Sequence, residues 1–506
     1  MIKIQSIGGV LKVFLPIFGA AFSTMPADGK AHKNPNIIFI LADDLGYGDV
    51  SALNEQSKIH TTNIDRLAQQ GVVFTDAHSS SAVCTPTRYG ILTGRYNWRS
   101  TLKSGVLNGY SPALVPHERK TVAALLKEEN YQTACMGKWH LGWTWNNIEK
   151  GKDSIDYSKP IKNGPTTLGF DYFYGFSGSL DMDPYVYVEN DMPTALPNRI
   201  TQSAGMKMWR KGATASDFDH EQTLPNLISR AEKYIGEKSK DKKPFFLYLA
   251  LPAPHTPILP IKEFQGKSGL NPYGDFVLMV DAMVGRVMAE VDKAGISDNT
   301  IVVFTSDNGC SPSANFAELK AKGHNPSYIY RGHKADLFDG GHRIPCIVRW
   351  PSKFKPHQVD QIICLNDFFA TFSAVTGYQV KDNEGEDSYN ILPLLLNTRP
   401  QKNIREATVH HSIDGNFTIR KGDWKLLFSA GSGGWSSPKS NEKIYKSLPP
   451  LQLYNMKSDS GESKNLCDEF PDVVRELKSL MIKYINDGRS TPGIPQKNDG
   501  KKIVLE

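Results

Sequence analysis

Three hydrophobic runs rich in β-branched and aromatic residues stand out from the mixed pattern of the chain, at residues 36–42, 244–251 and 301–305. Runs without polar alternation are typical of strands that are buried on both faces of a parallel sheet. Between these runs, hydrophobic residues recur with helical spacing at residues 62–70, 121–130 and 275–294. Strands that alternate with helices predict an α/β fold, with a large, mixed, mostly parallel sheet flanked by helices.

The pattern changes after residue 385. Short, partly alternating segments follow one another, separated by turn residues, at 407–411, 417–421, 424–428 and 451–454. They predict a small antiparallel sheet, and hydrophobic residues at helical spacing over 472–487 predict one packed helix. We therefore expect a catalytic α/β domain over residues 34–385 and a smaller C-terminal domain over residues 386–506, which ends in a loose tail.

The N-terminus has the pattern of a secretory signal peptide. Lys3 precedes an apolar run over residues 7–22 that only Lys12 interrupts, and small residues follow it. A charge inside so short a run argues against a stable membrane span, and no later run is long enough for one. We expect residues 1–27 to be a cleaved signal and the protein to be exported, to the periplasm or the medium.

Composition excludes several classes of protein. The chain has 506 residues, of which 40% are hydrophobic and 22% charged, as in a folded globular protein. A net charge of +6 over this length is too small to indicate binding to nucleic acid or to a membrane surface. The six cysteines include no Cys-x-x-Cys pair, which argues against a zinc ribbon or a thioredoxin-type motif.

Two acidic pairs follow predicted strands. Asp43-Asp44 ends the first hydrophobic run, and Asp307-Asn308 follows the run at residues 301–305. Ligands of open parallel sheets bind beyond the carboxyl ends of the strands, so we expect the two pairs to lie close together. Each pair is also common as a helix or turn cap, but the matching positions favour a site for a hard cation such as Ca²⁺ or Mg²⁺.

A third motif is Cys84-Thr-Pro-Thr-Arg88, followed by Leu92-Thr-Gly-Arg95. A cysteine that opens a helix, with proline in the first turn, lies where the helix dipole stabilises an anion. Arg88 lies four residues later, on the same helical face, and reaches a group held at Cys84. The motif predicts a site for a tetrahedral oxyanion, although a structural cysteine in a proline turn has the same local pattern.

Four further basic residues are candidates for chemistry. Alternation in an extended segment places Lys138 and His140 on one side of the chain. His255 stands between two prolines just after the run at residues 244–251, where core packing is a poor explanation. Lys334 precedes Asp339-Gly-Gly341. Taken alone, each histidine is more often structural and each lysine more often a solvated loop residue.

Together these residues resemble the type I sulfatase family, within the alkaline-phosphatase-like superfamily. The layout is also similar to exported bacterial glycan sulfatases and to the galactosamine-6-sulfatase type. The matching segments occur in one order along the chain: Asn36 to Asp49, Thr62 to Ala68, Cys84 to Arg88 with Leu92 to Arg95, Gly137 to Gly142, His255 to Pro257, Thr305 to Gly309, and Lys334 before Asp339. The family fold agrees with the two predicted sheets.

The resemblance implies that Cys84 is oxidised to formylglycine by a maturation enzyme and acts as the hydrated aldehyde. It also implies one divalent ion, usually Ca²⁺. The ion's ligands would be an oxygen of the modified Cys84 together with Asp43, Asp44, Asp307 and Asn308.

The same resemblance implies roles for the basic residues. Arg88 and the metal favour ionisation of one hydroxyl of the modified side chain, which attacks sulfur. Lys138 and Lys334 bind sulfate oxygens. His255 protonates or stabilises the leaving alcohol, and His140 takes the proton whose removal expels sulfate.

The substrate follows less directly. The resemblance favours a sulfatase for 6-O-sulfated galactose or N-acetylgalactosamine in host glycans, either mucin or glycosaminoglycan. Asp181, Asp219 and His220 are candidates for reading sugar hydroxyls, with local loop roles as the alternative. Trp143 and Trp145 either stack on a sugar or pack in the core. Two other functions stay open: a phosphodiesterase or phosphonate monoester hydrolase of the same superfamily, and a sulfated-glycan-binding protein without turnover.

Overall fold

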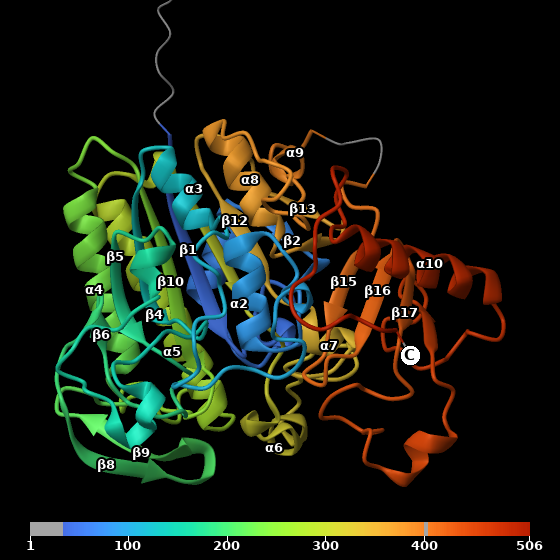
Figure 1. Ribbon diagram of the computed structural model, residues 1–506, viewed down its shortest axis with the longest axis horizontal. Coiled ribbons are helices and arrows are strands. Elements are labelled where there is room, and N and C mark those ends of the chain that lie inside the picture. The colour runs from blue at the N-terminus through green and yellow to red at the C-terminus, as the bar shows by residue number, and fades with distance from the viewer. Residues whose placement is uncertain (1–33, 399–402, 506) are drawn as a thin grey trace, which may run out of the picture. The chain divides into compact units, whose positions relative to one another are not determined.

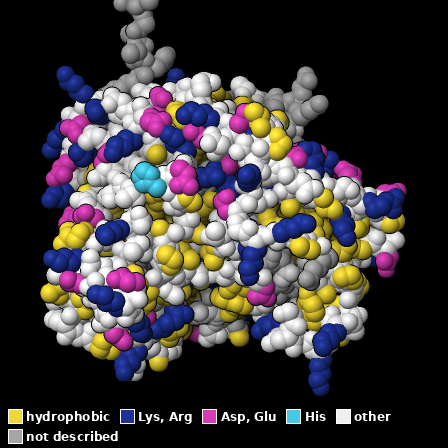
Figure 2. Space-filling view, viewed as in Figure 1, with side chains coloured by type: hydrophobic (Ala, Val, Ile, Leu, Met, Phe, Trp, Pro, Cys, Tyr) yellow, Lys and Arg dark blue, Asp and Glu magenta, His cyan; other side chains and the backbone are white. Residues whose placement is uncertain are grey.

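The computed structural model describes residues 34–398 and 403–505 (Figure 1). The predicted signal peptide, residues 1–27, lies outside the described residues. Within the described ranges, no helix has both the length and the apolar character needed to cross a membrane. In the face drawn in Figure 2, Lys and Arg side chains are interspersed with Asp and Glu, as the small net charge leads one to expect.

The large sheet has ten strands and is mixed, with a parallel centre. The parallel strands are β11 (Thr300–Ser306), β1 (Asn36–Asp43), β10 (Phe245–Pro254), β4 (Gln132–Lys138) and β5 (Tyr172–Phe176), in that spatial order. Strands that extend the sheet at its two edges are β12 (Cys346–Arg349), β2 (Val72–Phe74), β13 (His357–Val359), β6 (Val188–Glu189) and β7 (Met192–Pro193). The three predicted hydrophobic runs are confirmed as β1, β10 and β11, and they lie side by side.

Helices cover both faces of this sheet because alternate residues of the central strands face two separate cores. Ile37, Phe39 and Leu41 belong to one core, and Ile38 and Ile40 to the other. The helices on the first core are α2 (Cys84–Thr93), α3 (Val122–Glu128) and α8 (Asp367–Thr376). Those on the second core are α1 (Thr62–Gln70), α4 (Thr223–Lys238) and α5 (Pro272–Lys293). The predicted α/β fold is confirmed.

The C-terminal part forms a separate antiparallel sheet of four strands in chain order, as predicted. The strands are β15 (Thr408–His411), β16 (Phe417–Lys421), β17 (Trp424–Leu427) and β18 (Gln452–Asn455). Helix α10 (Pro471–Asp487) packs on this sheet because its apolar stripe, including Leu477 and Met481, contacts Ile419 and Leu426. Contacts group the described residues from Asn34 onward into one compact unit, so the boundary at residue 385 stays a prediction.

Smaller elements connect these parts. A hairpin of β8 (Pro197–Ser203) and β9 (Trp209–Ala215) stands apart from the large sheet, and β3 (Ala77–His78) pairs with β14 (Ile363–Cys364). Three short helices lie in connections: α6 (Phe316–Ala321), α7 (Asp339–His342) and α9 (Leu392–Leu395).

Candidate active site

The carboxyl ends of β11, β1, β10 and β4 meet at one edge of the large sheet, because these strands are parallel neighbours. Asp307 follows β11, Asp43 ends β1, His255 follows β10, and Lys138 ends β4. All four side chains are buried. The residues predicted at strand ends are therefore brought together by the topology of the sheet.

The two acidic pairs contact each other, as expected from the sequence. The backbone N–H of Asp44 donates to Asp307 Oδ1 at 3.2 Å, and Asn308 Nδ2 donates to Asp44 Oδ1 at 2.7 Å. Successive side chains of a strand point to opposite faces, which would separate Asp43 from Asp44. Asp44 instead has a φ of 63°, in the left-handed region that non-glycine residues rarely adopt. This turn directs its carboxylate into the cluster.

Three cations face these carboxylates. Lys138 Nζ donates to Asp43 Oδ2 at 2.7 Å, and Lys334 Nζ donates to Asp44 Oδ2 at 2.8 Å. Arg88 donates to Asp307 Oδ2 from Nη2 at 2.7 Å and from Nε at 3.1 Å. Three positive and three negative side chains thus balance one another in a buried place, which is the condition for keeping such charges out of water.

The crowding of carboxylates changes their protonation. Burial and the neighbouring Asp43 raise the pKa of Asp307 to about 7, against the effect of Arg88. Burial also opposes ionisation of Asp43, but Lys138 and the other nearby cations hold its pKa well below the usual value. One carboxyl of the cluster is therefore hard to ionise unless another cation lies beside it.

Helix α2 begins at Cys84, as the proline in its first turn predicts. Arg88 lies one turn later and also donates from Nη1 to the carbonyl of Lys138 at 3.0 Å. Burial raises the pKa of the Cys84 thiol, and Lys138 and Lys334 lower it only in part. All six cysteines are free, so no disulfide competes for this thiol. An unmodified Cys84 is a protonated thiol and a poor nucleophile at neutral pH.

His140 reaches the site by a different route from the one predicted. Strand β4 ends at Lys138, and His140 has a φ of 55°, so the expected extended segment does not continue through it. A tight turn orients the ring, whose Nε2 lies 2.7 Å from the carbonyl oxygen of Leu107. That oxygen only accepts, so Nε2 carries the hydrogen and the buried, unpartnered Nδ1 carries a lone pair.

His255 lies beside the carboxylate cluster. Its Nε2 is 3.6 Å from Asp44 Oδ2, and the hydroxyl of Ser179 lies 3.3 Å from its Nδ1. Burial and Lys334 lower the pKa of His255, against the effect of Asp44. Sequence reasoning missed Ser179 and the carbonyl of Leu107. A signal for Ser179 existed, because the small residues 177–179 follow strand β5 at the same sheet edge.

The predicted sugar-reading residues have different surroundings. Asp181 is buried two residues after Ser179, and its Oδ2 accepts from Arg210 Nη1 at 2.5 Å. Asp219 accepts the backbone N–H of Glu221 at 2.9 Å, which is a local turn role. Among the described residues, no hydrogen bond or ion pair joins Asp219 or His220 to the carboxylate cluster.

The three aromatic side chains that were candidates for sugar contact, His220, Trp143 and Trp145, have packing roles. The ring of His220 stacks on Trp209 with centroids 4.1 Å apart, and both line a cavity of about 300 Å³ beside the hairpin. Trp143 and Trp145 are each only 1% exposed and belong to the core. They pack against each other edge to face and have no ring face free for a sugar.

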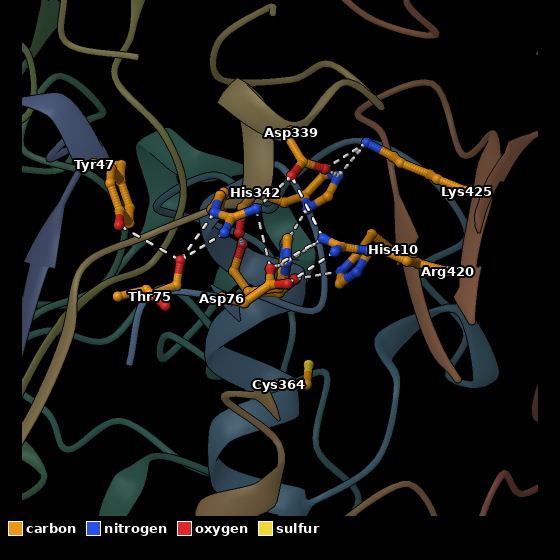
Figure 3. A network of polar contacts seen from close by, with 12 residues as sticks. Tyr47, Thr75, Asp76, Asp339, His342, Cys364, His410, Arg420 and Lys425 are labelled. Carbon is orange, nitrogen blue, oxygen red and sulfur yellow. Dashed lines mark hydrogen bonds and ion pairs between the residues drawn. The ribbon is translucent and has the colours of Figure 1, made fainter. Parts of the chain in front are cut away.

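A second buried polar cluster lies where the C-terminal sheet meets the large unit (Figure 3). Its members come from the connection between β2 and β3, from β3, from α7 and from strands β15 to β17. They are Asp76, His78, Asp339, His342, His410, Arg420 and Lys425. Sequence reasoning assigned none of these residues to a site, although Asp339 was named in the matched segment after Lys334.

Comparison with known proteins decides the family. The sulfatase family model matches residues 35–378. This chain belongs to the sulfatase family. The resemblance seen in the motifs is thus confirmed, and the chain is a sulfuric ester hydrolase.

The chain is 33% identical to an N-acetylgalactosamine-6-O-sulfatase of Bacteroides thetaiotaomicron, covering 90% of this chain and 94% of that protein. It is 31% identical to arylsulfatase A of Bos taurus, covering 94% and 93%. A solved sulfatase structure from work on glycosaminoglycan metabolism by Bacteroides thetaiotaomicron superposes with a TM-score of 0.78 at 32% identity, covering 89% and 99%.

Proposed function

We propose that this sulfatase removes the 6-O-sulfate of galactose or N-acetylgalactosamine in glycans and depends on Ca²⁺ and on formylglycine at residue 84. The observation that supports the reaction best is the buried convergence of Cys84, three carboxylates and three cations at one sheet edge. The sugar is supported by the likeness to N-acetylgalactosamine-6-O-sulfatase over nearly the whole of both chains.

The donor set fits a hard divalent cation. Asp43 Oδ1 and Asn308 Oδ1 are buried without a hydrogen-bond partner, although both belong to the carboxylate cluster. Buried polar atoms are nearly always paired, so two orphan oxygens in one cluster call for a ligand. Carboxylate and amide oxygens are the ligands that Ca²⁺ prefers. Asp43, Asp44, Asp307 and Asn308 would hold the ion, which would supply positive charge for the substrate and for the nucleophile.

Residue 84 fits a modified side chain better than a thiol. Cys84 is buried, lies at the positive end of α2 and is kept protonated, so the thiol itself contributes little nucleophilic power. Formylglycine at this position would supply an oxygen nucleophile and would allow sulfate to be released from the side chain. We propose that a maturation enzyme converts Cys84 and that the protein is exported before it meets its substrate.

The chain's own basic residues bind the sulfate group. Arg88, Lys138 and Lys334 are paired with carboxylates, and a cation held by those carboxylates would release the basic groups for sulfate oxygens. Positive groups fixed in advance around a group that gains negative charge lower the barrier, because no solvent has to reorganise.

Two histidines move protons in the proposed reaction. His140 has its hydrogen held on Nε2 by the carbonyl of Leu107, and burial holds its pKa well below the usual value, so it is a neutral base at Nδ1. His255 Nδ1 contacts the carbonyl of Thr256 and so carries a hydrogen, while Nε2 faces the carboxylate cluster. His255 therefore protonates the leaving alcohol oxygen from Nε2 as an imidazolium, the form that nearby Asp44 stabilises. Asp181, two residues beyond the Ser179 that contacts His255, is the predicted sugar reader best placed for contact with the substrate.

Sulfate release tests this proposal. The protein is co-produced with a maturation enzyme, conversion of residue 84 is measured by mass spectrometry, and Ca²⁺ is present. The substrates are galactose and N-acetylgalactosamine sulfated at O3, O4 or O6, N-acetylglucosamine 6-sulfate, and an aryl phosphodiester. Release confined to 6-sulfated galacto sugars supports the proposal.

The other outcomes separate its parts. Release from another sulfated sugar keeps the reaction and rejects the sugar. Turnover of the phosphodiester alone rejects sulfate as the substrate. Binding of sulfated sugar by fully converted protein without any release contradicts the enzyme and supports a binding function.

A further inference from the structure

A glycine- and serine-rich loop of the C-terminal part, residues 431–438, presents a tryptophan to solvent. Trp435 is 39% exposed and is the only exposed one of the chain's eight tryptophans. A single exposed hydrophobic residue is not by itself a sign of a binding site, but tryptophan is enriched at binding surfaces because it combines a large apolar ring with a polar N–H.

The loop that carries Trp435 is held in one conformation. Asp336 is fully buried and accepts the backbone N–H groups of Trp435 at 2.8 Å and of Ser436 at 3.0 Å, together with the Ser436 hydroxyl at 2.6 Å. The N–H of Leu337 donates to the carbonyl of Ser432 at 2.8 Å. A Cβ at Gly434 would lie 2.2 Å from the carbonyl oxygen of Ala335, so only glycine allows this approach.

The segment under the loop belongs to the sulfate site. Lys334, whose Nζ pairs with Asp44, lies two residues before Asp336. Ala335 has a φ of 82°, and its N–H donates at 2.8 Å to the carbonyl of Ala82, two residues before Cys84. A strained non-glycine backbone of this kind persists only where the surroundings hold it. The loop is therefore fixed to the residues that place Lys334 and Cys84.

We propose that Trp435 is the aromatic platform of a sugar subsite at the border of the sulfate pocket. This inference rests on the proposed function and adds the means by which the sugar is held. In a galacto-configured pyranose the axial O4 leaves one ring face covered only by C–H groups, which stack on an indole ring. The C-terminal part of the chain thus supplies a specificity contact that the strand ends do not contain.

A binding experiment tests the platform without turnover. In the full-length Cys84→Ala variant, N-acetylgalactosamine 6-sulfate shields Trp435 and lowers acrylamide quenching of tryptophan fluorescence toward the level of a Cys84→Ala/Trp435→Phe double variant. The other tryptophans are buried or half-buried, so the change reports mainly on Trp435. Quenching that does not change at a sugar concentration shown to saturate by calorimetry overturns the proposal.

Kinetics on the converted enzyme provide the second test. Trp435→Ala raises KM for the sulfated sugar by about tenfold, and Trp435→Phe, which keeps a ring, raises it much less. Inhibition by inorganic sulfate, which reaches only the sulfate pocket, stays unchanged. Ile444→Ala, at another exposed hydrophobic residue of the same part of the chain, leaves KM unchanged.

The remaining outcomes are distinct. If Trp435→Ala lowers kcat and weakens inhibition by inorganic sulfate to the same extent, the loop has a structural role and the platform proposal is overturned. If the converted enzyme releases no sulfate from any ester, the proposed function fails, while the quenching experiment still decides whether Trp435 binds sugar.

Discussion

Two buried clusters of charged side chains have different proposed roles in this protein, one in catalysis and one in structure. At the sheet edge, Asp43, Asp44 and Asp307 face Arg88, Lys138 and Lys334; at the junction with the C-terminal sheet, Asp76 and Asp339 face Arg343, Arg420 and Lys425 around three histidines (Figure 3). Both are dense in titratable groups, and both pair each acid with a base. Density and charge therefore do not distinguish a reaction centre from a structural network.

The kinds of atom left without hydrogen-bond partners and the packing of the rings do distinguish them. In the first cluster, the buried atoms without hydrogen-bond partners are oxygens of Asp43 and Asn308, whereas in the second they include the ring nitrogen Nε2 of His410. In the second, the rings of His342 and His410 stack with centroids 4.0 Å apart at 9°. A metal ion bound by histidine lies near the plane of its ring, and two stacked rings share no such point. His78, His342 and His410 are close enough to suggest a metal site, but in this arrangement they pack.

The junction network instead joins distant parts of the chain. His78 lies 2.7 Å from Asp76 through Nε2, and His410 Nδ1 donates to the carbonyl of Ser79 at 2.7 Å. Lys425, from β17, pairs with Asp339 of α7 at 2.7 Å. The network attaches the C-terminal sheet to the segment that leads into Cys84.

The largest expected effect is on activity. Cys84→Ala removes the only side chain proposed to act as nucleophile, so sulfate release falls to background. Because the replaced thiol is small and makes no hydrogen bond that holds the fold, the melting temperature stays within about 3 °C of the parent. Sulfate release and calorimetry on the same preparation check this. A large loss of stability would place Cys84 among the structural residues instead.

A substitution in the junction network is expected to lower stability instead of removing the nucleophile. Lys425→Met leaves Asp339 and Glu462 buried without their cation and lowers the free energy of unfolding by about 3–5 kcal/mol. Urea unfolding measures this loss. The control is Lys421→Met on the neighbouring strand, whose partners Glu406 and Glu476 are exposed, and it costs less than about 1 kcal/mol. Equal effects of the two variants would contradict the comparison.

Buried histidines predict that acid lowers the stability of the protein, and four of them lie in or beside the junction network. Burial lowers the pKa values of His78, His342 and His410 and lowers that of neighbouring His411 to about 4. The unfolded chain takes up these protons below about pH 6.5, whereas the folded chain takes them up only at lower pH. Stability is therefore present above that pH and lost as the pH falls.

Each such histidine contributes about 1.4 kcal/mol per pH unit while only the unfolded state is protonated. Urea unfolding at pH 7, 6 and 5 measures the slope. In His411→Phe, the slope of the free energy of unfolding against pH falls by about 1.4 kcal/mol per pH unit between pH 6 and pH 5, which corresponds to about one proton. An unchanged slope in that variant would show that His411 is not a neutral buried group.

Replacing Asp219 is expected to have the smallest effect on stability and on KM. Because its carboxylate accepts the N–H groups of Glu221 and Gln222 in a turn, Asp219→Ala lowers the free energy of unfolding by about 0.5–1.5 kcal/mol. KM for the sulfated sugar changes less than about threefold, because in the described ranges no hydrogen bond or ion pair joins Asp219 to the carboxylate cluster. A tenfold rise in KM with unchanged stability would return Asp219 to the substrate site.

Local sequence patterns predicted most of the helices and strands that make up the fold. The hydrophobic runs that became β1, β10 and β11, the helical spacing of α1, α3 and α5, and the short alternating segments of the C-terminal sheet each predicted their own element. The acidic pairs were found because a strand and the residues just after it are contiguous. The helix that starts at Cys84 was found because a proline in its first turn is a local signal.

Tertiary structure alone decided which of these residues touch. Lys334 meets Asp44 across 290 positions of sequence, and the N–H of Asp44 meets Asp307 across 263. No local pattern encodes such pairs, because they follow from strand order and from one left-handed turn at Asp44. For the same reason the burial of Trp143 and the exposure of Trp435 were beyond sequence reasoning: both are tryptophans beside polar residues, and only the packing around them separates a core ring from a surface one.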